Sequence, residues 1–320
     1  MKKGVIIGLT YGDPAGIGPE ILSDALLLKK FKFRPLVIGL KKYLKKKNYK
    51  NVPFVYPQKL DLKSKQKHIL PGHPGLFSAI HSYECLRESV SLALKKKIKA
   101  IITGPVSKQH IQLYKPKFIG QTEEIAKFCN LSPSDVIMLF VSNDLRIALY
   151  TRHISISRLP KYLTRLKLKK FILLLHKYMK QYFSIKNPKI AILGFNPHAG
   201  ERGAFGNEEI STIIPVIKDL KKLGVKVFGP FSPDGILAKA GSNYLKNKKQ
   251  EFDVFISMYH DQCLPMFKAV AGFNGVNVTL GLPFLRVSPD HGTAFDIAGK
   301  NKASAESYIS SVKILNGLLK

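Results

Sequence analysis

The 320-residue sequence contains no Trp and only three Cys residues, and these absences restrict the class of protein. Cys85, Cys129 and Cys263 are odd in number and too widely spaced for a disulfide framework or a CxxC metal site. A reducing compartment, the cytoplasm, therefore fits the cysteine content best. No apolar run is long enough to cross a bilayer, so we expect a soluble protein without a membrane partner.

Acidic residues are scarce as well: 21 Asp and Glu residues stand against 52 Lys and Arg residues, a formal net charge of +31. Such an excess raises the alternative of a basic nucleic-acid-binding protein. However, Lys outnumbers Arg by 44 to 8, whereas Arg is the residue suited to bidentate phosphate and guanine contacts. The lysines also lie in short scattered runs without interleaved aromatic residues. We interpret the charge as a solvated surface and expect no nucleic-acid partner, keeping the nucleic-acid binder as a remote alternative.

Short β-branched runs alternate with longer amphipathic stretches, a pattern typical of an α/β protein with a largely parallel sheet. The predicted strands are 4–9, 35–39, 99–103, 136–141, 146–151, 189–195, 225–228, 253–258 and 276–280. Apolar residues recur at helical spacing over 74–97, 159–182 and 207–223, which predicts helices there. A chain of this length with 45% hydrophobic residues can form two lobes with a cleft between them.

The segment Gly12–Glu20 follows the first predicted strand, where a dinucleotide-binding loop would lie, but it lacks the GxGxxG spacing. The third glycine that this motif requires is absent after Gly16-Ile17-Gly18. The sequence therefore does not support a Rossmann fold. From the residues alone, the segment is interpreted as a rigid turn before a helix.

Three histidines follow predicted strands, at the strand ends where ligands bind in open parallel sheets. His153, His198 and His260 come after the strands predicted at 146–151, 189–195 and 253–258. If these strands are neighbours, three imidazoles at one edge would hold a divalent cation with positions open for substrate. The alternative is three separate strand-end histidines with local hydrogen bonds, because no HExxH-type motif links them.

Lys268, Asn277 and Arg286 are candidates for binding a phosphate group, because a dianion needs cations and neutral donors together. Lys268 and Arg286 are predicted to follow turn or strand segments, and Arg286 lies in a chain poor in arginine. Gln121 and Thr122 open a predicted helix, where backbone N–H groups and a hydroxyl would face an anion. The alternatives are surface cations and, for Thr122, an ordinary helix cap.

Several longer motifs occur in order along nearly the whole chain. They are Gly12–Glu20, Thr103–Lys108, Asn196–Gly200, Tyr259–Gln262, Thr279–Pro283 and Asp290–Ala294. Together they resemble the 4-hydroxythreonine-4-phosphate dehydrogenase family of vitamin B6 biosynthesis. Gly16–Glu20 and His291–Gly299 also resemble the isocitrate and isopropylmalate dehydrogenases. The resemblance implies their fold: two α/β/α lobes with a cleft between them and a dinucleotide site that is not of the Rossmann type.

The same resemblance implies a division of the chain and a set of partners. Residues 1–125 with 275–320 would form the cofactor-side lobe, and 126–274 the lobe that binds metal and dimerises. The active protein would be a homodimer with shared active sites. Each site would hold NAD or NADP and one divalent metal, which would be Zn, Mg, Mn or Co.

The resemblance also assigns roles to single residues. The metal ligands would be His153, His198 and His260; the substrate-binding residues would be Gln121, Thr122, Lys268, Asn277 and Arg286. The cofactor would lie against His291, Gly292, Thr293, Ala294 and Asp296. Asp234 and Asp261 match acidic positions near the metal, and with Lys268 they are the catalytic candidates. Which group acts as the base stays open.

The implied activity is the oxidation of 4-phosphooxy-L-threonine to 2-amino-3-oxo-4-phosphooxybutanoate. This product decarboxylates to 3-amino-2-oxopropyl phosphate in pyridoxal 5'-phosphate biosynthesis. Two residues depart from the family pattern: Gln121 replaces the usual histidine, and Cys263 the usual glycine. We interpret Cys263 as a buried, inert thiol. Gln121 leaves open a same-fold dehydrogenase acting on a phosphorylated four-carbon sugar acid or a dihydrodiol.

Overall fold

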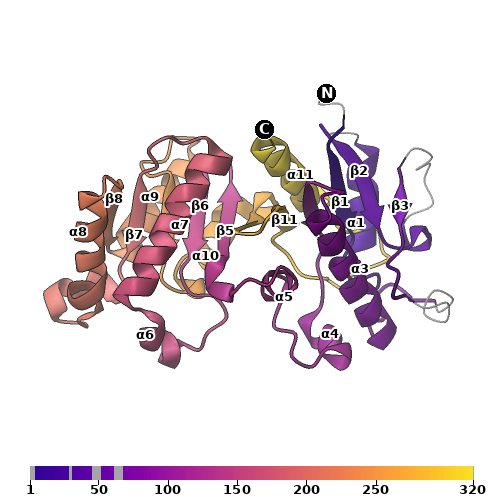
Figure 1. The fold of residues 1–320 in the computed structure, drawn as a ribbon, viewed down its shortest axis with the longest axis horizontal. Helices are drawn as coiled ribbons and strands as arrows, with labels where there is room; N and C mark the ends of the chain where they lie inside the picture. The colour runs from indigo at the N-terminus through magenta and orange to yellow at the C-terminus, as the bar shows by residue number, and fades with distance from the viewer. Residues whose placement is uncertain (1–3, 29–30, 45–51, 61–67, 320) are drawn as a thin grey trace. The chain divides into compact units, whose positions relative to one another are not determined.

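The computed structural model describes residues 4–28, 31–44, 52–60 and 68–319, and the chain divides into two compact units (Figure 1). Unit 1 comprises Met1–Val136 and Val276–Lys320, and unit 2 comprises Ile137–Gly275. Strands and helices alternate along each, which confirms the predicted α/β class. Every helix that the structure describes is too short or too polar to cross a membrane.

The strands of unit 1 lie in the order β3-β2-β1-β4-β11-β10. They are β1 (Ile6–Thr10), β2 (Arg34–Ile38), β3 (Phe54–Val55), β4 (Ala100–Thr103), β10 (Val276–Leu280) and β11 (Leu285–Pro289). Paired neighbours are parallel, except that β10 and β11 are antiparallel. Ile7 and Leu9 on one face of β1 and Gly8 on the other are all buried, as in a parallel sheet covered on both faces.

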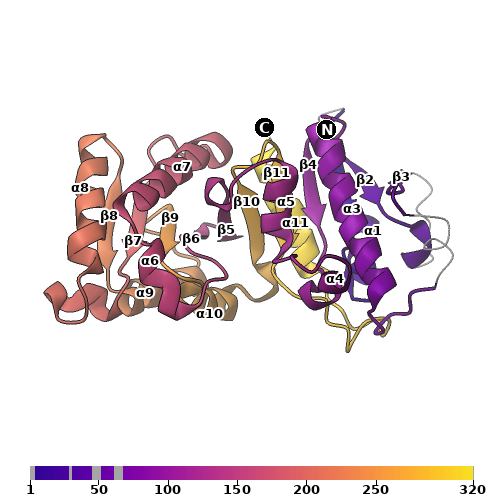
Figure 2. The same cartoon turned by 60° about the horizontal axis from the view of Figure 1, so that its bottom comes forward.

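The helices of unit 1 come from both ends of the chain. They are α1 (Gly18–Leu27), α3 (Leu76–Leu94), α4 (Lys108–Tyr114), α5 (Gln121–Phe128) and α11 (Glu306–Leu318). One apolar cluster joins α3, α5 and the sheet, with Leu86, Ile125 and Ile101 as members. The C-terminal helix α11 returns to this unit, where it contacts β10, β11 and α1 (Figures 1 and 2).

Unit 2 is a sheet with helices on both faces (Figure 2). Its strands are β5 (Ile137–Ser142), β6 (Leu145–Leu149), β7 (Ile190–Leu193), β8 (Val227–Phe231) and β9 (Val254–Ser257), in the order β5-β6-β9-β7-β8. Its helices are α6 (Leu159–Tyr162), α7 (Arg165–Phe183), α8 (Ile214–Lys222), α9 (Pro233–Leu245) and α10 (His260–Ala271). Phe140 packs with α9 and α10 in one core, whereas Tyr150 contacts Phe171 of α7 on the opposite face.

All the predicted strands are present, and the differences have local causes. Strands β3 and β11 are missed. β3 has only two residues. Gly281-Leu282-Pro283 precedes β11 and Pro289 ends it, so its five residues resemble a loop. The helix predicted over 159–182 is two helices, because Thr164 caps α7 by accepting the backbone N–H of Lys167. Lys268 lies within α10, so its predicted place after a turn or strand is wrong.

Candidate active site

Gly12–Glu20 is a tightly packed segment that leads into α1. Residues 11–20 are all buried. A Cβ atom on Gly18 would lie 1.7 Å from the carbonyl oxygen of Tyr11, so only glycine allows this close approach. The N–H of Ile17 donates to the carbonyl of Thr293 at 2.9 Å. Gly18 therefore serves chain packing at the start of α1, which agrees with the interpretation of the segment as a rigid turn before a helix.

The predicted cofactor-binding residues lie in a loop after β11 in unit 1. Thr293 is buried, His291 and Ala294 are partly exposed, and Gly292 and Asp296 are exposed. The loop is fixed by the contact of Thr293 with Ile17 and by Phe295, whose ring meets that of His110 edge-on at 5.5 Å between centroids. Its role in binding a nucleotide stays a prediction.

Arg286 lies in a buried cradle of threonine hydroxyls. Its side chain is 3% exposed. The guanidinium donates to Thr103 Oγ1 at 2.9 and 3.1 Å, to Thr279 Oγ1 at 3.1 Å and to Thr122 Oγ1 at 3.5 Å. Burial lowers the pKa of Arg286 to about 10, with Glu123 opposing this effect, so the group stays charged at neutral pH. A buried cation among neutral hydroxyls suits the binding of an anion.

Thr103 and Thr279 were not among the predicted binding residues, although both belong to motifs quoted above. Thr103 is the last residue of β4, and Thr279 stands opposite Arg286 in the β10–β11 pair. For Thr103 the sequence does contain a usable signal, because this residue ends a predicted strand, where ligands commonly bind. The pairing of Thr279 with Arg286 requires the register of β11, a strand that the sequence pattern does not reveal.

Two amide side chains near Arg286 have a buried oxygen without a hydrogen-bond partner in the described part of the chain: Gln121 Oε1 and Asn277 Oδ1. Gln121 Nε2 donates to the carbonyl of Gly104 at 3.1 Å, which fixes the orientation of that amide. Asn277 shares a strand face with Thr279, two residues further along β10. Because a buried acceptor left unpaired costs about 1–3 kcal/mol, these oxygens suit a ligand with N–H or O–H donors.

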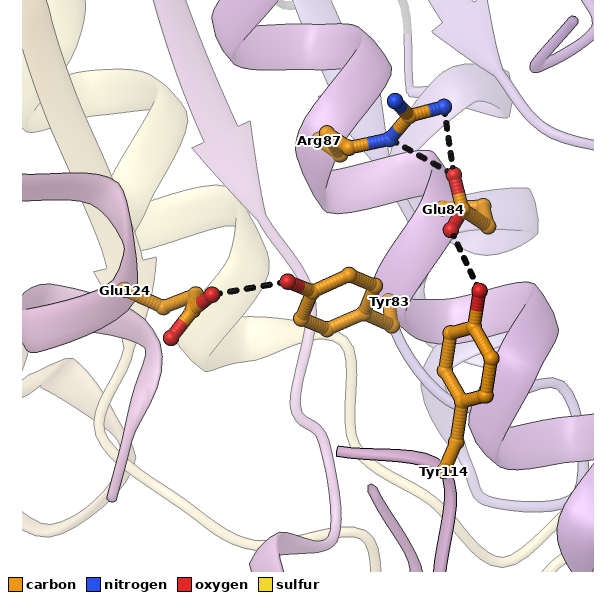
Figure 3. Close-up of polar contacts among 5 residues, drawn as sticks. All are labelled: Tyr83, Glu84, Arg87, Tyr114 and Glu124. Atoms are coloured by element: carbon orange, nitrogen blue, oxygen red, sulfur yellow. Dashed lines mark hydrogen bonds and ion pairs between the residues drawn. The ribbon is translucent and has the colours of Figure 1, made fainter. Parts of the chain in front are cut away.

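Two sets of polar contacts join helix α3 to α4 and to α5, the helix that begins with the predicted substrate residues (Figure 3). The Tyr83 hydroxyl donates to Glu124 Oε1 at 2.7 Å. Burial and the Glu124 carboxylate raise the pKa of Tyr83, so it remains a donor. From α4, Tyr114 donates to Glu84 Oε1 at 3.1 Å, and Arg87 Nε donates to Glu84 Oε2 at 2.7 Å. The Tyr83–Glu124 contact thus holds the first turn of α5 to α3, and the Tyr114–Glu84 contact holds α4 to the same helix.

Strands β6, β9 and β7 of unit 2 are neighbours, and all three are parallel. This confirms the premise that the three histidine-bearing segments leave the same edge of the sheet. Gln262 joins two of these strand ends: its Nε2 donates to the carbonyl of Gly194 at 2.7 Å, and its Oε1 accepts the N–H of Met258 at 2.8 Å.

The structure places the histidines in pairwise contacts. The rings of His153 and His260 lie 5.9 Å apart between centroids, and His260 Nδ1 lies 2.6 Å from Asp261 Oδ1. His198 Nδ1 lies 3.7 Å from Asp234 Oδ2. Among the described residues, no three His, Cys, Asp or Glu side chains are grouped so as to hold a metal ion. The three-histidine metal site stays a prediction.

The chemistry of these side chains fits a divalent metal. A histidine that binds a metal through one ring nitrogen usually donates the other ring N–H to a carboxylate or carbonyl. The contact with Asp261 engages Nδ1 of His260 and leaves Nε2 for a metal. Asp234 also lies on the Nδ1 side of His198, but at 3.7 Å, which is beyond hydrogen-bond distance. The Ser232 hydroxyl and the N–H of Gly235 lower the pKa of Asp234, so it is a carboxylate at neutral pH and a weak base.

Helix α10 carries two further residues singled out in the sequence. Lys268 is exposed and follows Asp261 by seven residues, which places it on nearly the same helix face about 10 Å along the axis. Cys263 is fully buried, and burial raises its pKa to about 12. This agrees with the interpretation of Cys263 as an inert thiol.

Known proteins resemble this chain over nearly its full length. The family model described as pyridoxal phosphate biosynthetic protein PdxA matches residues 19–315. A 4-hydroxythreonine-4-phosphate dehydrogenase of Aquifex aeolicus is 38% identical, over 98% of both chains. A D-threonate 4-phosphate dehydrogenase of Salmonella typhimurium is 32% identical, over 96% of this chain and 97% of the relative.

Solved structures of the same enzyme class also resemble this chain over nearly its full length. The crystal structure of a 4-hydroxythreonine-4-phosphate dehydrogenase from Klebsiella pneumoniae matches with a TM-score of 0.81 and 30% identity, over 99% of this chain and 100% of that one. Together these matches confirm the resemblance seen in the motifs. The chain belongs to the PdxA family of pyridoxal phosphate biosynthetic proteins.

Proposed function

We propose that this protein oxidises 4-phosphooxy-L-threonine with NAD or NADP to 2-amino-3-oxo-4-phosphooxybutanoate. That product decarboxylates to 3-amino-2-oxopropyl phosphate, a step of pyridoxal 5'-phosphate biosynthesis in the cytoplasm. The observation that carries the proposal is the match over 98% of the chain to a curated relative of that activity. The buried cation and its hydroxyl partners in unit 1 support a small anionic substrate.

Substrate binding is assigned to residues that present charge and unpaired acceptors. Arg286 and the hydroxyl of Thr122 bind an anionic group of the substrate. Gln121 Oε1 and Asn277 Oδ1 accept hydrogen bonds from its amino or hydroxyl groups. Lys268 adds a second positive charge. Holding the substrate at several points places its carbinol hydrogen for transfer, which is catalysis by orientation.

The metal ligands in this proposal are His153, His198 and His260, and the metal is Zn, Mg, Mn or Co. A divalent metal bound there lowers the pKa of an alcohol that binds it. Asp261 holds the ring of His260 through Nδ1, and Asp234 faces the corresponding nitrogen of His198. Both carboxylates are candidates for accepting the alcohol proton.

A nucleotide cofactor and a second copy of the chain complete the proposed site. The loop 291–296 takes the adenosine part of the cofactor, with its backbone held by Thr293 and Phe295. A second copy of the chain forms the homodimer that completes each active site.

A second candidate is the oxidation of D-threonate 4-phosphate, a phosphorylated four-carbon sugar acid, because a relative at 32% identity carries that activity. The two substrates differ at carbon 2, where one has an ammonium group and the other a hydroxyl. An ammonium group donates charge-assisted hydrogen bonds to the acceptors of Gln121 and Asn277, and such bonds are about twice as strong as neutral ones.

We therefore expect kcat/KM for 4-phosphooxy-L-threonine to exceed that for D-threonate 4-phosphate by about 10-fold, which corresponds to about 1.4 kcal/mol. Initial rates of NAD and NADP reduction with both compounds and with a cis-dihydrodiol measure this ratio. A higher kcat/KM for D-threonate 4-phosphate would establish the second candidate, and turnover of the dihydrodiol alone would contradict both.

Removing divalent metal is expected to abolish turnover. Protein treated with a chelator and then desalted should lose NAD reduction, and adding Zn²⁺, Mn²⁺ or Co²⁺ should restore it, because the alcohol then ionises more easily. Protein desalted without chelator is the control. Full turnover by protein that elemental analysis shows to be free of metal would remove the metal from the proposal.

A further inference from the structure

The segment that carries His198 has an unusual backbone. The five residues His198–Arg202 all have positive φ angles, between 41° at Glu201 and 79° at Gly200. The left-handed conformation costs a residue other than glycine about 1–2 kcal/mol, and only Gly200 in this turn escapes that cost. Such a conformation persists only where the surrounding structure imposes it.

The turn packs against the buried carboxylate of Glu209. Glu209 is 2% exposed and its Oε1 accepts the backbone N–H groups of Phe195 and Asn196 at 2.7 and 2.8 Å. Its Oε2 accepts from Asn196 Nδ2 at 2.9 Å. A Cβ atom on Gly200 would lie 2.7 Å from the same Oε2, so the turn itself packs directly on the carboxylate. One buried side chain thus fixes both the entry to the turn and its middle.

Glu209 also stands at an unusual point of the helix that follows the turn. Glu209 begins a π-helix, Glu209–Ile213, the only one in the part of the chain that the structure describes. π-Helical turns are rare and frequently lie at functional sites. This one starts at the residue that reaches back 13 and 14 positions to the turn.

His198 depends on this support for its orientation. Its side chain is 58% exposed, so few neighbouring atoms hold the ring. Its contacts are Asp234, 3.7 Å from Nδ1, and the ring of Phe205, 6.3 Å away between centroids. Because packing does not fix the imidazole, the backbone of the turn sets its direction.

We propose that Glu209 is a positioning residue for His198: it holds the left-handed turn so that the imidazole keeps its place opposite Asp234. The inference rests on the proposed role of His198 as a metal ligand. Loss of the carboxylate frees the turn, and His198 then spends only part of its time in the geometry that binds metal. Disturbing residues that orient a metal ligand typically weakens metal affinity about 10- to 100-fold.

The test compares two variants in the full-length chain. Glu209→Ala removes all three accepted hydrogen bonds. Glu209→Gln has the same shape and keeps an oxygen for the two backbone N–H groups, but it turns an NH₂ group toward Asn196. The dissociation constant for Co²⁺ is measured by titration calorimetry on metal-free protein, together with the thermal unfolding midpoint. We expect affinity to fall about 10- to 100-fold in the Ala variant and less in the Gln variant.

Glu251→Gln is the matched control, because Glu251 lies in the same unit and pairs at the surface with Lys239 at 2.7 Å. It changes the net charge equally without touching the turn, so its Co²⁺ affinity should equal that of the wild type. Folded Glu209 variants with wild-type affinity would overturn the inference, and so would an equal loss in the control. Failure of both variants to fold would make Glu209 a folding residue instead. Wild-type protein that binds no Co²⁺ would overturn the proposed metal site and this inference together.

Discussion

Replacing His198 with Asn is expected to reduce kcat/KM at least about 10³-fold, or about 4 kcal/mol, while the chain stays folded. Asn tolerates the left-handed conformation that His198 adopts, with φ of 51°. The substitution therefore removes the imidazole without adding backbone strain. NAD reduction with 4-phosphooxy-L-threonine measures the activity, and circular dichroism measures the fold.

A matched control separates this effect from a general effect of losing a histidine. His73 is exposed and lies in unit 1, outside the candidate site, so His73→Asn should keep wild-type kcat/KM. Elemental analysis of both variants adds a direct readout, since only the His198 variant should have lost its metal. Wild-type turnover by the folded His198 variant would show that this histidine is not a metal ligand.

Replacing Arg286 with Lys is expected to raise KM for 4-phosphooxy-L-threonine about 100-fold, because truncating a buried hydrogen-bonded charge costs about 2–5 kcal/mol. Lys retains one positive charge but has no planar fork of N–H groups. Its single nitrogen therefore cannot occupy both positions from which Nη1 donates to Thr279 and Nη2 donates to Thr103. Initial-rate kinetics over a range of substrate concentrations measure KM and kcat separately.

Arg158→Lys is the control for this substitution, because Arg158 is exposed and belongs to unit 2. Its KM should match that of the wild type. We expect kcat of the Arg286 variant to fall less than KM rises, provided that the residue acts mainly in binding. An Arg286 variant that folds and has an unchanged KM would contradict the assignment of this cradle to the substrate.

The strands were predictable because their composition reflects their surroundings. In both units, residues on both faces of the central strands are buried, so these strands appear in the sequence as continuous apolar runs such as Ile190–Leu193. The polar residues after such runs then lie at one edge of a parallel sheet. His153, His198 and His260 each follow such a run, so the sequence alone makes them candidates for one site.

The details of the site could not be predicted, because they depend on contacts between remote residues. Glu201 and Arg202 have no local preference for a left-handed backbone, and the buried carboxylate of Glu209 that packs against the turn lies beyond it in the sequence. The cradle of Arg286 likewise depends on the pairing of β11 with β10 and β4, which local composition does not encode. Motifs locate such residues in the sequence, whereas tertiary contacts decide their geometry.

The central claim is that histidines from three neighbouring strand ends bind one divalent metal. Anomalous X-ray diffraction from crystals grown with Zn²⁺ tests it most directly. The account predicts one strong peak per active site, with ring nitrogens of His153, His198 and His260 at about 2.0–2.1 Å, counting both subunits of the dimer. An active enzyme whose metal peak lies elsewhere, with these three rings bound to no metal, would contradict it.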